Sequence, residues 1–68
     1  MGVEGFTCNL KIYRQMKGMT QEQLASAVGV RRETIMRLEK AQYNPSLKLA
    51  IDISRNVEAP IEEIFIFE

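Results

Sequence analysis

Two adjacent arginines, Arg31 and Arg32, lie in the stretch LASAVGVRRETI, where an amphipathic segment begins. An arginine side chain keeps its positive charge and offers a planar fork of N–H donors, which suits it to bind phosphate groups. Residues 11–40 hold seven lysines and arginines against three glutamates, a net charge of +4, whereas residues 41–68 carry −3. The overall net charge of zero therefore conceals an uneven distribution, as expected if one face of the protein meets phosphate.

The residue types that most enzymes and metal sites need are scarce. The chain has no histidine, it lacks a glycine-rich loop with phosphate-binding spacing, and its carboxylates have no evident catalytic partners. Its single cysteine, Cys8, excludes an intrachain disulfide, and we interpret it as a small buried hydrophobic residue rather than a redox sensor. We therefore expect no enzyme activity, metal, cofactor or small-molecule ligand.

Length and hydropathy bound the architecture. A chain of 68 residues with 46% hydrophobic content is enough for one domain, residues 1–68, with a single core of short helices. It contains neither the run of roughly 20 apolar residues that spans a bilayer nor a secretory leader. We expect a soluble, cytoplasmic protein without membrane contact, and we expect self-association to supplement its small core.

Apolar residues recur every three or four positions, which predicts helices separated by glycine and proline. The predicted helices cover about 9–17, 20–27 and 31–40, a fourth that begins near Asn44-Pro45-Ser46, and a fifth after Pro60. Gly18 is expected to end the first helix, and Thr20 with Gln23 forms a capping-box pattern at the second. Proline suits the first turn of the fourth helix, whose segment LKLAIDI is apolar on most sides and predicts a central position in the bundle.

The two ends of the chain have a different pattern. Residues 3–7 and 64–67 are rich in β-branched and aromatic types, so they could pair as a short β-ribbon. An exposed apolar end would be a liability on so small a domain unless something covers it. This pattern points to a dimer interface at the termini.

The spacing of small and apolar residues after Gln21 matches a helix-turn-helix unit over about 20–40. Counting Gln21 as the first position, Ala25 is fifth, Gly29 ninth, Ile35 fifteenth and Leu38 eighteenth. Ala25 is small enough for two helices to cross closely, and Gly29 permits a left-handed backbone in the turn. The apolar residues around them are expected to form the wedge that fixes the crossing angle.

The stretch TQEQLASAVGVRRETIMRLEK, followed by YNPSLKLAIDI, resembles the Cro and phage-repressor class of helix-turn-helix domains, often called Xre-like. The resemblance covers about 9–65 and is closest to the short, stand-alone dimeric repressors of that class. It implies an all-α, five-helix, lambda-repressor-like bundle, and a transcriptional repressor that binds a palindromic operator in double-stranded DNA as a homodimer. The alternative is an antitoxin or adaptor that uses the same fold to bind a protein.

The resemblance also implies the residues that read the bases. In this class the second helix of the motif enters the major groove, and Arg32, Glu33 and Arg37 match positions that face base edges. Arginine can donate two parallel hydrogen bonds to guanine, and glutamate can accept one from cytosine N4. Glu33 could instead orient Arg32 or Arg37 through a charge pair.

Further residues are expected to contact the DNA backbone or to flank it; they are Gln21, Arg31, Thr34, Lys40, Tyr43 and Asn44. Gln21 corresponds to a phosphate-binding glutamine, although it could be a solvated residue of the first turn, and Tyr43 could instead cover the edge of the core. Thr34 could meet a thymine methyl or a phosphate. Arg31 departs from the class, which usually has a serine or threonine cap here, so it is expected either to contact phosphate or to be a tolerated poor cap.

The remaining assignments are structural. Arg14 and Glu39 match positions that form a salt bridge between the first helix and the recognition helix, and we expect this pair to be partly buried. Ala25 and Gly29 are expected to shape the motif itself. The expected dimer interface consists of Ile61, Ile64, Phe65 and Phe67.

Overall fold

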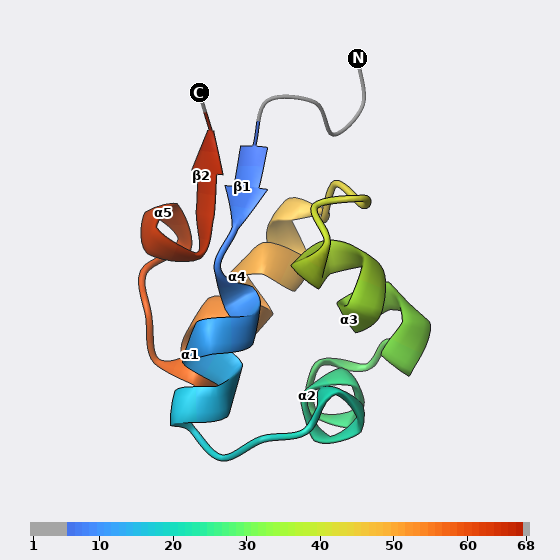
Figure 1. The fold of residues 1–68 in the computed structure, drawn as a ribbon. Helices are drawn as coiled ribbons and strands as arrows, with labels where there is room; N and C mark the ends of the chain where they lie inside the picture. The colour runs from blue at the N-terminus through green and yellow to red at the C-terminus, as the bar shows by residue number, and fades with distance from the viewer. Residues whose placement is uncertain (1–5, 68) are drawn as a thin grey trace.

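The computed structural model describes residues 6–67. Their elements are, in chain order, β1 (Phe6–Cys8), α1 (Leu10–Met16), α2 (Gln21–Val28), α3 (Arg32–Glu39), α4 (Leu47–Val57), α5 (Ile61–Ile64) and β2 (Phe65–Phe67). The five predicted helices are confirmed, each within a few residues of its expected bounds (Figure 1). None of these helices has the length and apolar character that crossing a bilayer requires.

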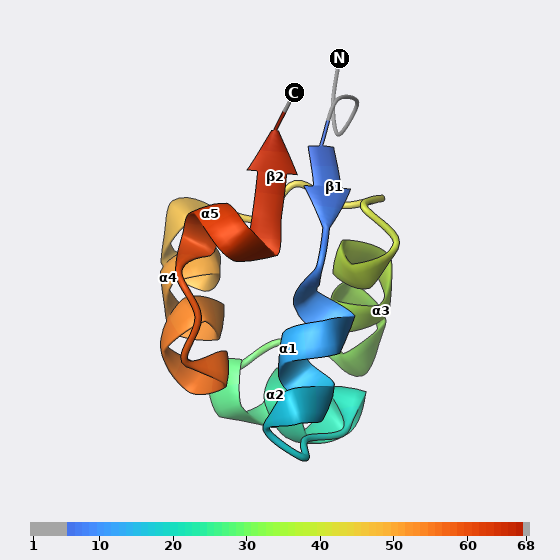
Figure 2. The same ribbon diagram turned by 60° about the vertical axis from the view of Figure 1, so that its left-hand side comes forward.

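The two strands form a small antiparallel ribbon, as predicted. Phe6 pairs with Phe67, Thr7 with Ile66, and Cys8 with Phe65. The ribbon lies at the end of the bundle opposite α2 in both ribbon views (Figures 1 and 2). The prediction of strand from residue 64 was wrong by one position, because Ile64 is the last residue of α5; the part of the expected first strand before Phe6 lies outside the described residues.

The helix boundaries follow local chemistry. Thr20 and Gln23 exchange both hydrogen bonds of a capping box, at 3.0 and 2.9 Å, and Gly18 has the left-handed backbone, φ 70°, that follows the end of α1. Ser46 caps α4 by accepting from the backbone N–H of Leu49 at 3.1 Å. The prediction of proline in the first turn of α4 was wrong: Pro45 precedes the cap, where its fixed φ shapes the entry to the helix.

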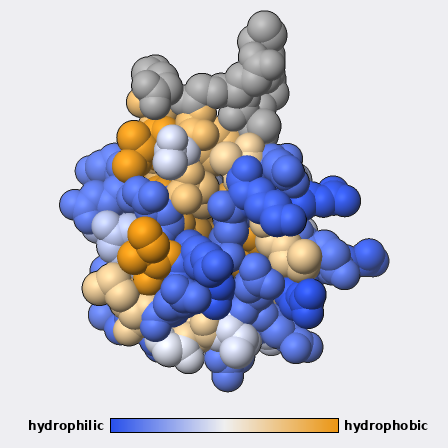
Figure 3. Space-filling view, viewed as in Figure 1, coloured by the Kyte–Doolittle hydropathy of each residue, from blue (hydrophilic) through white to orange (hydrophobic). Residues whose placement is uncertain are grey.

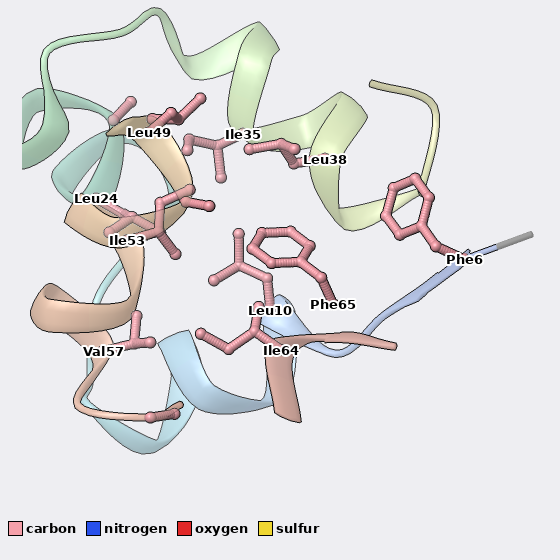
Figure 4. Packing of buried hydrophobic residues seen from close by; sticks show 13 residues of the cluster. Phe6, Leu10, Leu24, Ile35, Leu38, Leu49, Ile53, Val57, Ile64 and Phe65 are labelled. Atoms are coloured by element: carbon pink, nitrogen blue, oxygen red, sulfur yellow. The ribbon is translucent and has the colours of Figure 1, made fainter. Parts of the chain in front are cut away.

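The core is one cluster to which every helix contributes (Figure 4). Its fully buried large side chains are Leu10, Leu24, Ile35, Leu38, Ile53 and Ile64. Helix α4 buries Leu49, Ala50, Ile53 and Val57, but Leu47 at its start is 75% exposed. The prediction that α4 is surrounded by other helices was therefore wrong, because it is an amphipathic helix with one face open.

Candidate nucleic-acid interface

Helices α2 and α3 form the helix-turn-helix unit around a turn of three residues. Gly29 adopts φ 76° in this turn, and the N–H of Val30 donates back to the carbonyl of Ala25 at 3.0 Å. Ala25 is 2% exposed, and the apolar residues Leu24 and Ile35 are fully buried. The expected roles of Ala25 and Gly29 thus agree with the structure, and the packed wedge leaves the outer face of α3 directed to solvent.

Glu39 anchors the inner side of α3 to two other helices. Its carboxylate accepts from Arg14 Nε at 2.6 Å and Nη2 at 3.3 Å, and from Gln21 Nε2 at 3.0 Å. The side chains of Arg14 and Glu39 are only 8% and 6% exposed, and Arg14 Nη1 also donates to the carbonyl of Met19 at 2.8 Å. The buried salt bridge expected from the sequence is therefore present, and it includes a partner, Gln21, that the sequence did not indicate.

The outer face of α3 and its flanks present mostly positive charge. The side chains exposed here are those of Arg31, Arg32, Glu33, Arg37 and Lys40. Four of them are cationic and one is anionic, because the other carboxylate of α3, Glu39, is buried. Figure 3 shows that this side of the molecule is covered mainly by hydrophilic residues. Such a surface suits an anionic partner with hydrogen-bond acceptors.

Arg31 occupies the N-cap of α3 without acting as a cap. Its backbone is extended, with φ −79° and ψ 154°, and its side chain makes no hydrogen bond to the first turn. The free N–H groups of that turn and the helix dipole both favour an anion there. The guanidinium group of Arg31 is exposed, so it is accessible to an anion that the same N–H groups would attract.

The two predicted base-reading arginines differ in their surroundings. Arg32 folds back along the helix, with Nη2 3.5 Å from the sulfur of Met36. Within residues 6–67, Arg37 forms no side-chain ion pair, and neither does Glu33. The charge pair that would let Glu33 orient either arginine is therefore not formed in this conformation. Met36 was not among the predicted site residues, and only its helical spacing from Arg32 could have indicated it.

The predicted backbone-contacting residues lie at the start of α2, at the N-cap of α3 and within it, and in the segment that follows α3. Gln21 is half-buried and bonded to Glu39, so it is not simply a solvated residue of the first turn. Thr34 is half-buried, and Asn44 is exposed in the segment that follows α3. Tyr43 is 40% exposed and is not part of the core. The positions beyond Glu39 are separated from Arg31 by the length of an eight-residue helix, about 12 Å.

The expected dimer interface requires a correction. Ile64 and Phe65 are 0% and 3% exposed in the single protomer, because α5 and β2 turn these side chains into the core (Figure 4). Ile61 is half-buried against the same core. Phe67 is 62% exposed, and its neighbour Ile66, which was not predicted, is 41% exposed. Among the predicted interface residues and their neighbours within 6–67, the apolar side chains accessible at this end are therefore Ile66 and Phe67, with part of Ile61.

Cys8 lies beside this end, in β1, and is half-buried. Burial raises the pKa of its thiol above the ordinary value, while a backbone hydrogen bond with Leu10 acts in the opposite direction. A raised pKa lowers the fraction of reactive thiolate at neutral pH. The structure thus favours the interpretation of Cys8 as a packing residue.

Known proteins of similar sequence are helix-turn-helix regulators. The model of the helix-turn-helix family matches residues 10–64. A protein of Archaeoglobus fulgidus named as an uncharacterized HTH-type transcriptional regulator is 61% identical over 59 residues, which cover 87% of this chain and 83% of that protein. A regulator of the same description from Methanocaldococcus jannaschii is 51% identical, with coverage of 87% and 89%.

Solved structures share the fold. The restriction-modification controller protein C.AhdI from Aeromonas hydrophila superimposes with a TM-score of 0.71 at 30% identity, covering 79% of this chain and 82% of that one. The clp gene regulator ClgR from Corynebacterium glutamicum gives a TM-score of 0.73 at 26% identity and covers 79% of this chain. This chain spans 57% of the ClgR chain.

Proposed function

This chain belongs to the helix-turn-helix family of DNA-binding transcription regulators, and from that premise we propose that it is a repressor that binds a palindromic operator as a homodimer. Helix α3 enters the major groove, where Arg32, Glu33 and Arg37 read base edges. Arg31, Gln21, Thr34 and the residues after α3 contact or flank the sugar-phosphate backbone.

The observation that carries this proposal is the exposed cationic face of α3 on a rigid support. The helix is held from behind by its buried residues and by the Arg14–Glu39 pair, whose Nε–Oε2 distance is 2.6 Å. The guanidinium groups of Arg32 and Arg37 remain exposed on the other side. Recognition of bases requires hydrogen-bonding groups presented at fixed positions on such a rigid element.

Two features support the homodimer. The protomer measures about 30 × 21 × 19 Å and has one helix-turn-helix unit, whereas two half-sites of an operator lie about 34 Å apart along DNA. Two copies are therefore needed to occupy both half-sites. The exposed side chains of Ile66 and Phe67 at the ribbon end would lose contact with water in a self-complementary, two-fold interface.

The first experiment is selection of bound sequences from a random pool of double-stranded DNA, followed by affinity measurements at several salt concentrations. The proposal expects an inverted repeat that is preferred over scrambled DNA by about a thousandfold or more. Binding of all sequences alike, with only a steep salt dependence, would contradict it. In that case the alternative of a protein-binding adaptor on this fold becomes the better hypothesis.

Sedimentation of the free protein and of its operator complex tests the assembly. The proposal expects two copies on each inverted repeat. It also expects that Phe67→Ser weakens the dimer without lowering the melting temperature of the protomer by more than a few degrees, because Phe67 is largely exposed. Ile12→Ser is the matched control, since Ile12 is also exposed, at 56%, but lies on α1.

A further inference from the structure

Met36, on α3, is partly buried although it does not pack against the hydrophobic core. It is half-buried, yet it is not among the partly buried hydrophobic residues that pack against the core cluster. On the same helix, Ile35 and Leu38 fill the core positions and are fully buried. The contact that the structure gives the Met36 sulfur is instead with Arg32 on the outer face of α3.

The contact between Arg32 and Met36 leaves most of the hydrogen-bonding capacity of the arginine free. Arg32 and Met36 are four positions apart and therefore neighbours on the helix surface. The distance from Nη2 to Sδ is 3.5 Å, and a thioether sulfur is a weak hydrogen-bond acceptor. This contact uses one N–H of the five on a guanidinium group, so the two parallel donors that grip guanine O6 and N7 remain available.

Arg37 lacks this support. It is exposed, and within residues 6–67 its side chain has no hydrogen-bond or ion-pair partner. A long side chain that is free before binding must be ordered during binding, which reduces affinity by a factor of about two to ten. The structure thus distinguishes a supported arginine from an unsupported one on the same helix face.

We infer that Met36 is a positioning residue for Arg32, and that it sharpens the discrimination of the base pair that Arg32 contacts. The inference rests on the proposed function, because it deepens the role of the same helix face. Met36 acts through the arginine, by holding the guanidinium group over the helix in one conformation. The base pair contacted by Arg37 is outside its influence.

The test compares Met36→Leu and Met36→Gln in the full-length chain. Leucine keeps the apolar bulk but has no acceptor, whereas glutamine has similar length and restores an acceptor oxygen; both are good helix formers. The two base pairs are first identified as those at which Arg32→Ala and Arg37→Ala lose discrimination on the selected operator. The affinity ratio of each variant for the operator and for a duplex changed at one of these pairs is then measured. Because it is a ratio on one sample, it does not depend on the folded fraction.

Met36→Leu is expected to lower discrimination at the base pair that Arg32 contacts by a factor of about two to ten. It should leave discrimination at the base pair that Arg37 contacts unchanged. Met36→Gln is expected to restore the wild-type affinity ratio. An unchanged ratio in Met36→Leu, an equal loss at both pairs, or a failure of glutamine to restore discrimination would each overturn the inference. A wild-type protein without any sequence preference would instead refute the proposed function, and the inference with it.

Discussion

Helix α3 carries two groups of charged residues that the fold treats in opposite ways. On the inner side, Glu39 is 6% exposed and accepts three hydrogen bonds from Arg14 and Gln21. On the outer side, Arg32 and Arg37 are exposed. A buried charge is tolerated only when its hydrogen-bonding capacity is filled, and an exposed one is free to exchange water for a ligand. The comparison separates charges that hold the helix from charges that can recognise a partner.

The inner group also joins elements that are distant in the sequence. Arg14 belongs to α1, Gln21 begins α2, and Glu39 ends α3. A shift of any of these helices would separate at least one of the donors from the carboxylate. The position of the outer arginines relative to the rest of the protein is therefore fixed by charges on the opposite side of their own helix.

The strongest test of this comparison removes the inner carboxylate. Glu39→Ala is expected to lower the free energy of unfolding by about 3–5 kcal/mol, because it leaves the buried Arg14 guanidinium without its counter-charge. Chemical denaturation followed by circular dichroism measures the change. The matched control is Glu33→Ala on the exposed side, for which a change within about 0.5 kcal/mol is expected. If Glu39→Ala and Glu33→Ala changed the free energy of unfolding by similar amounts, the inner carboxylate would have no special role in holding α3.

The second test removes the outer charges one at a time. Arg32→Ala and Arg37→Ala are each expected to reduce the preference for the selected operator by about 1–3 kcal/mol at one symmetric pair of positions. Because both side chains are exposed, the melting temperature should change little. Quantitative binding to matched and mismatched duplexes measures the preference, and thermal denaturation of the same samples is the control. A loss of stability that accompanies the loss of binding would argue against recognition.

Arg31 lies between the two groups, so its replacement should change stability and binding in opposite directions. Arg31→Ser supplies a side chain that can cap α3, and it is expected to raise the free energy of unfolding by about 1 kcal/mol. It should also weaken binding uniformly across sequences and reduce the salt slope by about one. Denaturation and salt-dependent binding measure the two effects. An unchanged salt slope would mean that Arg31 is only a poor cap.

The smallest expected effect concerns an exposed pair. Lys17 and Glu58 are 3.0 Å apart, but their side chains are 37% and 70% exposed, so the pair contributes at most about 1 kcal/mol. Glu58 also has a left-handed backbone, φ 58°, at the end of α4. Glu58→Gly relieves this strain and is expected to give a net stabilisation of about 0.5 kcal/mol. Glu58→Ala removes the ion pair with Lys17 but keeps a side chain in the left-handed conformation. Chemical denaturation should therefore show that this variant is slightly less stable than the wild-type protein.

Much of the fold was predictable because its signals are local. The capping box of Thr20 and Gln23, the glycines at 18 and 29, and the spacing of Ala25 and Ile35 each depend on residues within a few turns of one another. The left-handed Glu58 is an exception, because glutamate gives no signal for that conformation. Glu58 is the C-cap of α4, and after it the N–H of Ala59 donates to the carbonyl of Ser54 at 3.2 Å, which closes the end of the helix.

The site was less predictable, because its contacts join distant residues or depend on a side-chain conformation. The Gln21–Glu39 hydrogen bond spans 18 positions, and no spacing rule relates these two residues. Ile64 and Phe65 were predicted to lie in a dimer interface but are buried within the protomer. An apolar sequence does not reveal whether a side chain is covered by its own protomer or by a second copy. Of the predicted interface residues, Phe67 is largely exposed, at 62%, and its neighbour Ile66, which was not predicted, is 41% exposed.

The pairing of Phe6 with Phe67 makes the described chain nearly a closed ring. A ring has no preferred starting point, so a short covalent linker across the ribbon would allow the chain to be opened elsewhere without changing its packing. The exposed segment between α3 and α4 is a suitable place, because Gln42 and Asn44 are both exposed. The helix-turn-helix unit would then lie at the new carboxyl end, and the ribbon would become an internal hairpin.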